Sequence, residues 1–374
     1  MKLALLYYKE KAVHKLNITV MGSGNLGFAM AAHLSRGGNK VTLWNRSAST
    51  ISRVIKTGVI HCTGIINGQI PIHTVTTDIT VALKEPDIIL IATPANSHKG
   101  LAELIAKNIN KSTVIILNPG RTFGALEFGN IYKKYNTRHK QIIGESQTII
   151  YTCRKTDVDA VNIIALKDRV QIFSPDTDNI IDYLPECIRG HFAPAKSMIQ
   201  TSIGNVGMVL HCAPLLLNAG WTESDRNIYK YYYDGITPTI GEFIEKIDME
   251  RVAVSEKLGC KVESTIEWFS RTYHVSGKSI YECIQKNDSY KTIDAPGSLK
   301  HRYILEDVPC GLVPLEAIGL KLGLGMEYTT LTIDLASKLM NTDFRKTGRN
   351  LEYLNTISDK NELKAAFGGE LRHG

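Results

Sequence analysis

The strongest constraint on the fold is a glycine pattern, G-x-G-x-x-G, at residues 22–27. The apolar run 18–21 precedes it and is typical of a buried strand. A helix-compatible segment follows and ends at the glycine pair 37–38, after which KVTLW, residues 40–44, is typical of a second strand. Because strand, glycine turn, helix and strand follow in the order of a βαβ unit, the pattern favours a Rossmann-type dinucleotide-binding domain over a simple glycine-rich turn.

Each glycine of the pattern has a distinct expected role. Gly22 permits the tight turn, Gly24 lets the backbone approach a pyrophosphate, and Gly27 lets the helix pack close to the strand. The helix N-terminus then offers free N–H groups to the phosphates. We therefore predict that the cofactor binds to the whole loop, which consists of Gly22, Ser23, Gly24, Asn25, Leu26 and Gly27.

The residues after the second strand select the cofactor. NAD-binding units commonly have an acidic residue there for the ribose 2′-hydroxyl, whereas this chain has Asn45, Arg46 and Ser47. An arginine at this place accommodates a 2′-phosphate, although a solvated surface arginine is the simpler alternative. The sequence therefore favours NADP and leaves NAD possible. Thr93 and Pro94 end a further apolar run and are expected to line the same crevice.

The first half of the chain continues as a sheet. Residues 113–120 are a further apolar run, and the segments 142–154 and 161–175 are rich in β-formers without long helical intervals. They predict that the sheet continues with mixed or antiparallel strands. The Rossmann-type domain is expected to extend to residue 195, with residues 1–15 as a short extension ahead of the first strand.

The second half, residues 196–374, changes to helical periodicity. Residues 238–259 have apolar side chains at helical spacing, and 224–235 are expected to form a turn and a helix. Three further amphipathic helices are expected at 263–273, 313–323 and 328–340. The predicted fold class is therefore α/β plus all-α, with an N-terminal Rossmann-type domain followed by a C-terminal helical domain.

The composition limits the classes of partner. The net charge of +7 is spread along the 374 residues, which suits an anionic cofactor or carboxylate substrates and does not indicate nucleic acid. The seven cysteines form no Cys-x-x-Cys pair, so neither a disulfide framework nor a metal site is expected, and a reducing cytoplasm fits. The amino-terminal apolar stretch is too short for a signal peptide or a membrane span.

One histidine, His211, lies in the otherwise apolar segment NVGMVLHCAPLLLNAG, residues 205–220. Taken alone, this segment favours packing, because single histidines in apolar surroundings are more often core residues than catalytic ones. Pro214 inside the expected helix frees the carbonyl of Leu210 and kinks the axis. Such an irregular turn is compatible with a ligand site and equally with a kinked core helix.

Several blocks of the chain resemble the octopine/nopaline (opine) dehydrogenase family. Residues 205–220 resemble its Asn-x5-His segment with a following Leu-Leu-Asn, and 299–314 resemble its Arg-Tyr-x-x-Glu-Asp-Val block. Residues 346–354 resemble its Thr-Gly-Arg segment, and 118–128 and 144–154 are similar to further family segments. The matches keep the family order across roughly residues 17–355, which makes them far more specific than the glycine pattern alone.

The resemblance implies an enzyme that joins the amino group of an amino acid to an α-keto acid and reduces the resulting imine with NADPH or NADH. His211 matches the family's catalytic histidine, Asp307 the aspartate that partners it, and Asn205 the asparagine that precedes it. An imidazole suits this role because it exchanges protons near neutral pH. The chain departs from the family at Cys212-Ala213-Pro214, where the family often has proline directly after the histidine.

Arginines are the candidate ligands for the substrate carboxylates, because a guanidinium binds a carboxylate through two hydrogen bonds. The candidates are Arg121, Arg302 and Arg349, and an ordinary surface or ion-paired arginine is the alternative for each. The consecutive tyrosines 231–233 cannot all face one cleft from a helix, so they are expected to be core and surface residues.

Two other functions remain as alternatives. A β-hydroxyacid or ketopantoate-type NADP reductase has a similar architecture, but its Lys-x-x-x-Asn pattern is absent from the start of the helical half. A non-catalytic NADP-binding sensor is the third possibility, and the retention of both His211 and Asp307 argues against it. The expected partners are an amino acid and an α-keto acid, and a homodimer is the expected assembly.

Overall fold

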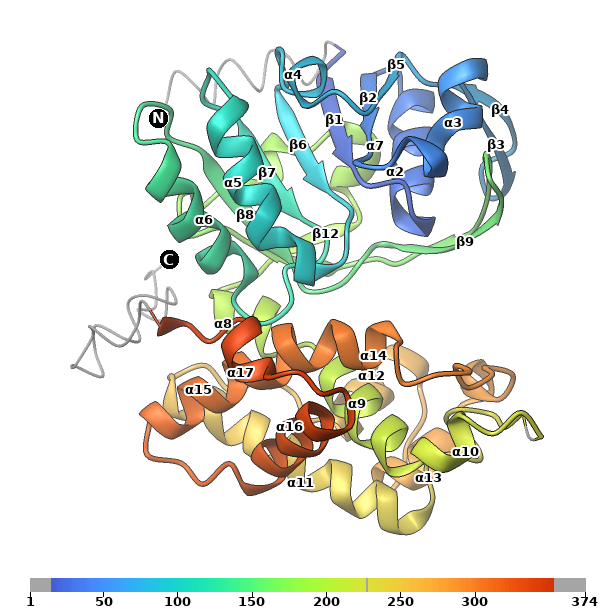
Figure 1. The fold of residues 1–374 in the computed structure, drawn as a ribbon, viewed down its shortest axis with the longest axis vertical. Helices are drawn as coiled ribbons and strands as arrows, with labels where there is room; N and C mark the ends of the chain where they lie inside the picture. The colour runs from blue at the N-terminus through green and yellow to red at the C-terminus, as the bar shows by residue number, and fades with distance from the viewer. Residues whose placement is uncertain (1–14, 227, 353–374) are drawn as a thin grey trace. The chain divides into compact units, whose positions relative to one another are not determined.

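The computed structural model describes residues 15–226 and 228–352, so the expected amino-terminal extension lies outside the described residues except for Lys15. The chain forms two compact units (Figure 1). The first contains residues up to Gly120 and 124–201, and the second contains Arg121–Phe123 and the chain from Ser202 onward. The boundary expected after residue 195 stays a prediction.

The segment Arg121–Phe123 belongs to the second unit, although the sequence placed it inside the first domain. Its backbone explains the difference. Thr122 N donates to Cys310 O at 3.2 Å, and Phe123 N donates to the Ser202 hydroxyl at 2.9 Å. These partners lie far away in the sequence, so no local pattern indicates them.

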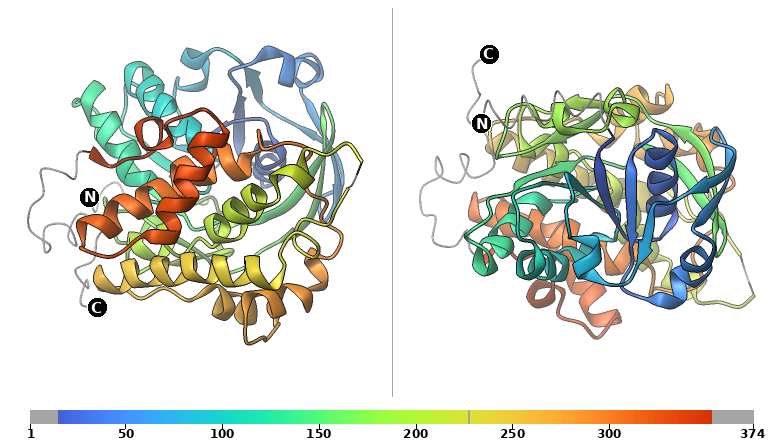
Figure 2. Two further views of the ribbon diagram at one scale, coloured as in Figure 1. Left: turned by 60° about the horizontal axis from the view of Figure 1, so that its bottom comes forward. Right: turned by 90° about the horizontal axis from the view of Figure 1, so that it is seen from above.

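The first unit is built on an eight-stranded sheet in which neighbouring strands are parallel except for one antiparallel pair, β8 and β11. Figure 2 shows these strands from above. In sheet order the strands are β12 (Phe192–Pro194), β11 (Val170–Phe173), β8 (Ile142–Ser146), β7 (Val114–Leu117), β6 (Ile88–Ile91), β1 (Asn17–Met21), β2 (Lys40–Trp44) and β5 (Thr74–Thr76).

Helices connect the strands of this sheet, which confirms the predicted Rossmann-type architecture. Strands β6 and β7 are buried along their whole length, as expected for parallel strands covered on both faces. The helices of the first unit are α2 (Asn25–Arg36), α3 (Ala48–Thr57), α4 (Ile79–Ala82), α5 (His98–Asn108), α6 (Gly124–Tyr135) and α7 (Glu186–Arg189), with α8 (Met198–Ser202) at its carboxyl end.

The prediction that residues 142–175 all continue the main sheet is only partly correct. Strands β8 and β11 do so, but β9 (Tyr151–Asp157) and β10 (Ala160–Leu166) form a hairpin in a second sheet of order β4-β3-β10-β9. Its other strands are β3 (Val59–Gly64) and β4 (Gly68–Pro71). Side chains of β9 alternate between buried and exposed positions, as in a half-buried strand, whereas the strands at the centre of the main sheet are buried throughout.

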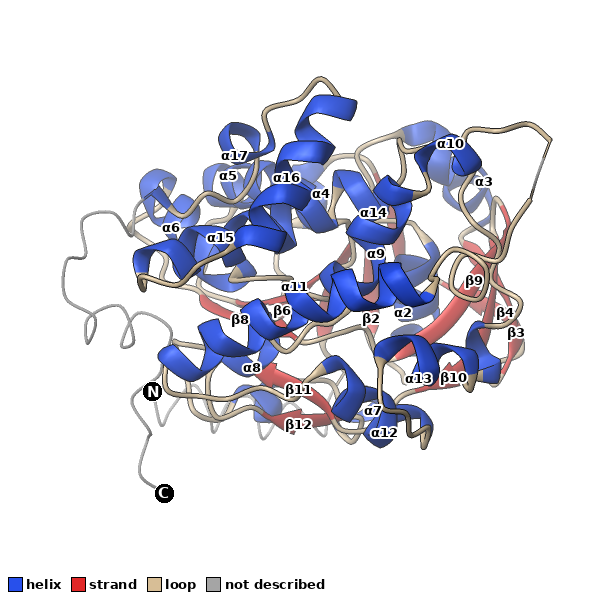
Figure 3. Ribbon diagram, turned by 90° about the horizontal axis from the view of Figure 1, so that it is seen from below, coloured by secondary structure: helices blue, strands red, loops and turns tan. Residues whose placement is uncertain are grey.

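The second unit is helical in its described residues, as predicted. Figure 3 shows its longest helix, α11 (Pro238–Lys257), which packs against α9, α13, α15 and α16. Its helices are α9 (Gly207–Leu217), α10 (Ala219–Thr222), α11, α12 (Thr265–Tyr273), α13 (Ile280–Gln285), α14 (Arg302–Leu305), α15 (Val313–Lys321), α16 (Glu327–Leu339) and α17 (Phe344–Thr347).

The helix expected within residues 224–235 is wrong. The described part of this segment consists of turns and one bridge between Lys230 and Asp294. Tyr231 N donates to Ile293 O at 2.8 Å, and Lys230 N donates to the Asp234 carboxylate at 2.6 Å. These bonds take up backbone N–H groups that a helix would use. Tyr231 and Tyr232 are buried and Tyr233 is half-buried, so the run is divided between core and surface as expected.

Within the described residues, no helix combines the length and the apolar character that crossing a lipid bilayer requires.

Candidate functional site

The glycine loop lies where the strand order of the sheet changes direction. From β1 the chain goes to β2 on one side and later to β6 on the other, which is the switch point at which open α/β sheets bind ligands. Gly22 has φ +114°, and its N–H donates to Trp44 O at 2.8 Å. A Cβ on Gly22 would lie 2.8 Å from Thr93 Cγ2, so the loops after β1 and β6 are in contact.

The residues of this loop fit the pyrophosphate of a dinucleotide. A Cβ on Gly24 would meet nothing within 4 Å, so the backbone there is open to a ligand. Helix α2 begins at Asn25 without a side-chain cap or an acidic residue in its first turn. The Ser23 hydroxyl is buried and has no hydrogen-bond partner within the described part of the chain. Free N–H groups, the helix dipole and an unused hydroxyl together favour an anion.

Three residues predicted to lie beside a 2′-phosphate, Asn45, Arg46 and Ser47, follow β2 directly. Asn45 Nδ2 donates to Ser47 O at 3.0 Å, which closes a short turn around Arg46. Arg46 is exposed and makes no ion pair with any residue that the structure describes. The Thr93 hydroxyl accepts from the Ser97 hydroxyl at 2.7 Å, and Pro94 precedes the turn Ala95–Ser97.

Two glycine substitutions separate folding from cofactor binding. In Gly27→Ala the new Cβ would lie 1.9 Å from Gly22 O, so we expect a loss of about 1–3 kcal/mol in the free energy of unfolding. In Gly24→Ala the Cβ points into open space, so stability should stay within about 0.5 kcal/mol of the parent while NADPH binding weakens. Urea unfolding and NADPH fluorescence titration measure the two effects, and undiminished NADPH affinity in Gly24→Ala would contradict the pyrophosphate assignment.

In the second unit, His211 and Asp307 form the pair that the sequence predicted. His211 Nδ1 lies 2.8 Å from Asp307 Oδ2, and the two residues are 96 positions apart in the sequence. An ionised carboxylate only accepts hydrogen bonds, so in the neutral ring Nδ1 carries the proton and Nε2 has the lone pair. The imidazole is 17% exposed and Asp307 is 1% exposed. The pair therefore presents one basic nitrogen from a largely enclosed ring.

Arg121 forms an ion pair with the second carboxylate oxygen of Asp307. Its guanidinium lies 3.0 Å from Asp307 Oδ1 and 3.1 Å from Glu306 Oε1, and its side chain is 7% exposed. Burial by itself raises the pKa of Asp307, but the charges of Arg121 and His211 and the His211 hydrogen bond outweigh it and hold that pKa below its ordinary value. Asp307 is thus an ionised, fixed partner for the imidazole.

The local backbone places both carboxylates. Helix α14 ends after Leu305, and one turn of π-helix follows at Val308–Leu312, where Cys310 N still donates to Glu306 O at 2.9 Å. The irregular turn carries Glu306 and Asp307 to the same guanidinium. Such π-type insertions are frequent at functional sites.

Asn205 supports this arrangement. Its Oδ1 accepts from Gly207 N at 2.8 Å, at the start of α9, and from Arg121 at 3.5 Å. A Cβ on Gly207 would lie 3.0 Å from the Arg121 guanidinium, so the glycine leaves room for that side chain. The structure therefore places the predicted asparagine beside Arg121 and at the first turn of the helix that carries His211.

Three tyrosines surround His211, and the sequence analysis missed their role. The Tyr303 ring stacks on the imidazole with centroids 3.9 Å apart and planes 13° apart. The Tyr232 hydroxyl lies 3.2 Å from Nε2. The Tyr231 hydroxyl donates to His211 O at 2.6 Å, close to the point where Pro214 interrupts the helical hydrogen bonds. Of the three, only Tyr303 had a signal in the sequence, because it is the tyrosine of the Arg-Tyr-x-x-Glu-Asp-Val block at residues 299–314.

The three candidate arginines have different environments. Arg349 is 1% exposed and donates to Thr122 O at 2.6 Å, so it holds the segment that carries Arg121. Arg121 is engaged with the two carboxylates. Arg302 is 56% exposed in its side chain, with Nε 3.2 Å from Glu306 Oε2. Arg302 is therefore the candidate whose guanidinium is accessible to a dissolved carboxylate.

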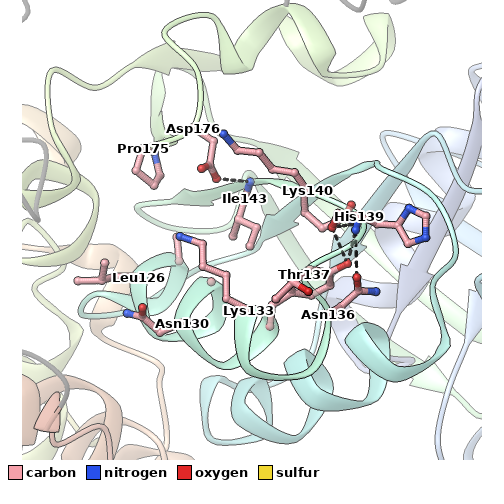
Figure 4. A pocket seen from close by; sticks show the side chains of 14 residues that line it. Leu126, Asn130, Lys133, Asn136, Thr137, His139, Lys140, Ile143, Pro175 and Asp176 are labelled. Carbon is pink, nitrogen blue, oxygen red and sulfur yellow. Dashed lines mark hydrogen bonds between the residues drawn. The ribbon is translucent and has the colours of Figure 1, made fainter.

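A cavity of about 510 Å³ lies beside α6 in the first unit (Figure 4). The side chains of Lys133 and Lys140 line it, and Asp176 accepts from Ile143 N at 3.0 Å at its edge. None of the predicted site residues lines this cavity, and it lies at the amino end of β8, whereas the glycine loop lies at the carboxyl end of β1.

The lowered pKa of Asp307 predicts a pH-dependent contribution to stability. A carboxylate whose pKa is lower in the folded state than its ordinary value of 3.8 stabilises the fold above that pH, and this stabilisation is lost as the pH falls below it. We expect Asp307→Asn to be less stable than the parent near neutral pH and this difference to shrink under acid. Urea unfolding of both proteins along a pH series checks this, and a difference that grows toward low pH has the wrong sign.

Comparison with known proteins matches both units. A family model described as the alpha-helical domain of NAD/NADP octopine/nopaline dehydrogenase matches residues 194–340. A model for the N-terminus of NAD-dependent glycerol-3-phosphate dehydrogenase matches residues 17–123. An opine dehydrogenase of Arthrobacter sp. (strain 1C) is 37% identical over 343 residues, which cover 90% of this chain and 94% of that protein.

Solved structures share the fold. An octopine dehydrogenase with NADH and L-arginine has a TM-score of 0.74 at 18% identity, covering 96% of this chain and all of that one. Yersinopine dehydrogenase with NADP+ has a TM-score of 0.73 at 13% identity, covering 96% of this chain and 98% of that one.

Proposed function

The chain belongs to the octopine/nopaline (opine) dehydrogenase family, and on that premise we propose that it condenses the amino group of an amino acid with an α-keto acid and reduces the imine, or runs the reverse oxidation. It is an NAD(P)-dependent oxidoreductase. The observation that carries the proposed chemistry is the His211–Asp307 pair, whose geometry leaves Nε2 as the basic atom.

His211 moves the proton in this proposal. Its Nε2 accepts a proton from the incoming ammonium, which frees the amine to attack the keto carbon. As the amine attacks, one of its protons passes to the keto oxygen, which becomes the hydroxyl of the carbinolamine. The imidazolium then returns its proton to that hydroxyl, which leaves as water. Asp307 stabilises the imidazolium and keeps the ring in one orientation, because it holds Nδ1 at 2.8 Å. When bound, NAD(P)H supplies the hydride that the resulting iminium carbon accepts.

Three arginines and Asn205 have the remaining roles in the proposal, which are substrate binding and positioning of the His211–Asp307 pair. We assign the substrate carboxylate to Arg302, because it is the exposed member of the three candidate arginines. The His211–Asp307 pair is positioned by Arg121, Arg349 and Asn205. Arg121 contacts the buried carboxylate of Asp307, and Arg349 and Asn205 hydrogen-bond to the backbone. These roles are supported by the contacts within the second unit alone.

The cofactor assignment rests on residues 22–27, 45–47, Thr93 and Pro94 of the first unit. The open backbone at Gly24 and the buried Ser23 hydroxyl suit the pyrophosphate, and Arg46 suits a 2′-phosphate. We propose NADP as the preferred cofactor.

Family membership disfavours the ketopantoate-type reductase, and the assay below decides between an enzyme and a non-catalytic sensor. The homodimer and the cytoplasmic location stay predictions.

The direct test is oxidation of NADPH followed by absorbance, with amino acids paired with pyruvate, 2-oxoglutarate or oxaloacetate. We expect at least one pair to be consumed in the presence of the enzyme. No amino-acid-dependent oxidation with any pair would falsify the proposed function. In His211→Ala we expect kcat to fall by about 10²–10⁴-fold in a protein that still folds, because the general acid–base group is lost. His191→Ala is the matched control, since His191 pairs with the exposed Asp168.

Cofactor preference has its own test. In Arg46→Asp we expect the KM for NADPH to rise about tenfold or more while the KM for NADH changes little, since a charged hydrogen bond to the 2′-phosphate is lost. Arg138→Asp makes the same charge change at another exposed position and should leave both constants unchanged. Equal losses for the two cofactors in Arg46→Asp would show that Arg46 does not contact the 2′-phosphate.

A further inference from the structure

The Nε2 atom of His211, which does not contact Asp307, has a hydrogen-bond partner of its own within the second unit. Asp307 accepts the proton of Nδ1, so Nε2 is an acceptor, and the Tyr232 hydroxyl lies 3.2 Å from it. The phenol therefore donates to the nitrogen that the proposed chemistry uses. Sequence reasoning gives Tyr232 no such role, because it stands in a run of three tyrosines.

Packing holds the Tyr232 hydroxyl in this place. Its ring stacks on Tyr290 with centroids 4.1 Å apart and meets Tyr231 edge-on at 4.9 Å, and the residue is 4% exposed. The turns of residues 230–235, anchored by the Tyr231 N–H to Ile293 O, set the direction of the side chain. Burial raises the pKa of the Tyr232 phenol well above its ordinary value, so the hydroxyl stays neutral.

We propose that Tyr232 is a positioning residue for the acid–base step, whose hydroxyl holds Nε2 of His211 in the resting state and supports the imidazolium when it forms. This inference rests on the proposed function, and it adds a residue outside the family blocks that the sequence matched.

The hydroxyl suits both protonation states of the ring. With neutral His211 it donates its hydrogen to the Nε2 lone pair. When Nε2 takes a proton, the hydroxyl rotates and its oxygen accepts from the new N–H until that proton passes to the carbinolamine hydroxyl, so tyrosine loses no proton at any stage. A hydrogen bond from a charged donor is stronger than one between neutral groups, so loss of the hydroxyl destabilises the imidazolium more than the neutral ring.

Other titratable and charged groups also face this pair. They come from α9, α14, the 121–123 segment, the 230–235 turns, and the residues around Asp307 and Tyr290. These groups are Arg121, Cys212, Tyr231, Tyr290, His301, Arg302, Tyr303, Glu306 and Asp307. All of them remain when only one hydroxyl is removed. Tyr232→Phe therefore keeps the ring and its packing and removes the contact to Nε2 together with the hydrogen bond that Tyr232 shares with Tyr303.

The experiment removes that hydroxyl and keeps the ring. In Tyr232→Phe we expect kcat to fall about tenfold while the KM values for both substrates change little, because a charged hydrogen bond contributes about this factor. The acid limb of the profile of kcat/KM against pH should move to lower pH by about half a unit to one unit. Tyr233→Phe is the matched control, since its hydroxyl donates to Gln285 O at 3.0 Å instead.

A second measurement does not depend on turnover. The ring proton of His211, assigned by its absence from His211→Ala, is titrated by NMR in the parent, Tyr232→Phe and Tyr233→Phe. We expect the midpoint to move to lower pH in Tyr232→Phe alone, with thermal unfolding showing that all three proteins are folded. Unchanged midpoint and unchanged kcat in Tyr232→Phe would show that Tyr232 only packs. If the midpoint shifts in Tyr232→Phe but the parent turns over no substrate pair, the contact is supported and the proposed function is overturned.

Discussion

The buried carboxylate of Asp307 is the interaction on which the candidate site depends. A charge that is 1% exposed is strongly unfavourable unless each oxygen has a partner, and here Oδ1 meets Arg121 while Oδ2 meets His211. This requirement explains why Arg121–Phe123 belongs to the second unit, and why Arg121 adopts φ 60° despite the backbone strain. It also explains the supporting contacts of Arg349 and Asn205, which hold the arginine segment in place.

The candidate sites of the two units depend on different physical constraints. In the first, backbone geometry determines the site, because the glycine loop needs a positive φ at Gly22 and no Cβ at Gly27. In the second, side-chain charge and burial determine it, through a buried ion-pair network that ends at the imidazole of His211. The enclosing tyrosines complete that network, since they restrict the ring on one face, at its backbone carbonyl and at Nε2.

Sequence analysis predicted those parts of the structure that depend on local patterns. The glycine spacing and the apolar runs indicated the sheet and its nucleotide loop, and helical periodicity indicated α11. The resemblance to a family paired His211 with Asp307. The roles of Arg121 and Tyr232 depend on contacts between distant segments, which periodicity does not contain. The 224–235 segment was misassigned for the same reason, because its backbone pairs with residues 293–294.

The central claim is that Asp307 holds His211 in the tautomer whose Nε2 is unprotonated and can accept a proton. The most direct measurement is a nitrogen-15 spectrum of histidine-labelled protein at mildly alkaline pH, with His211 assigned by substitution. The account predicts a protonated Nδ1 and an unprotonated Nε2 in the neutral ring. A neutral His211 with the proton on Nε2 would contradict it, because Nδ1 would then have no hydrogen to donate to the carboxylate.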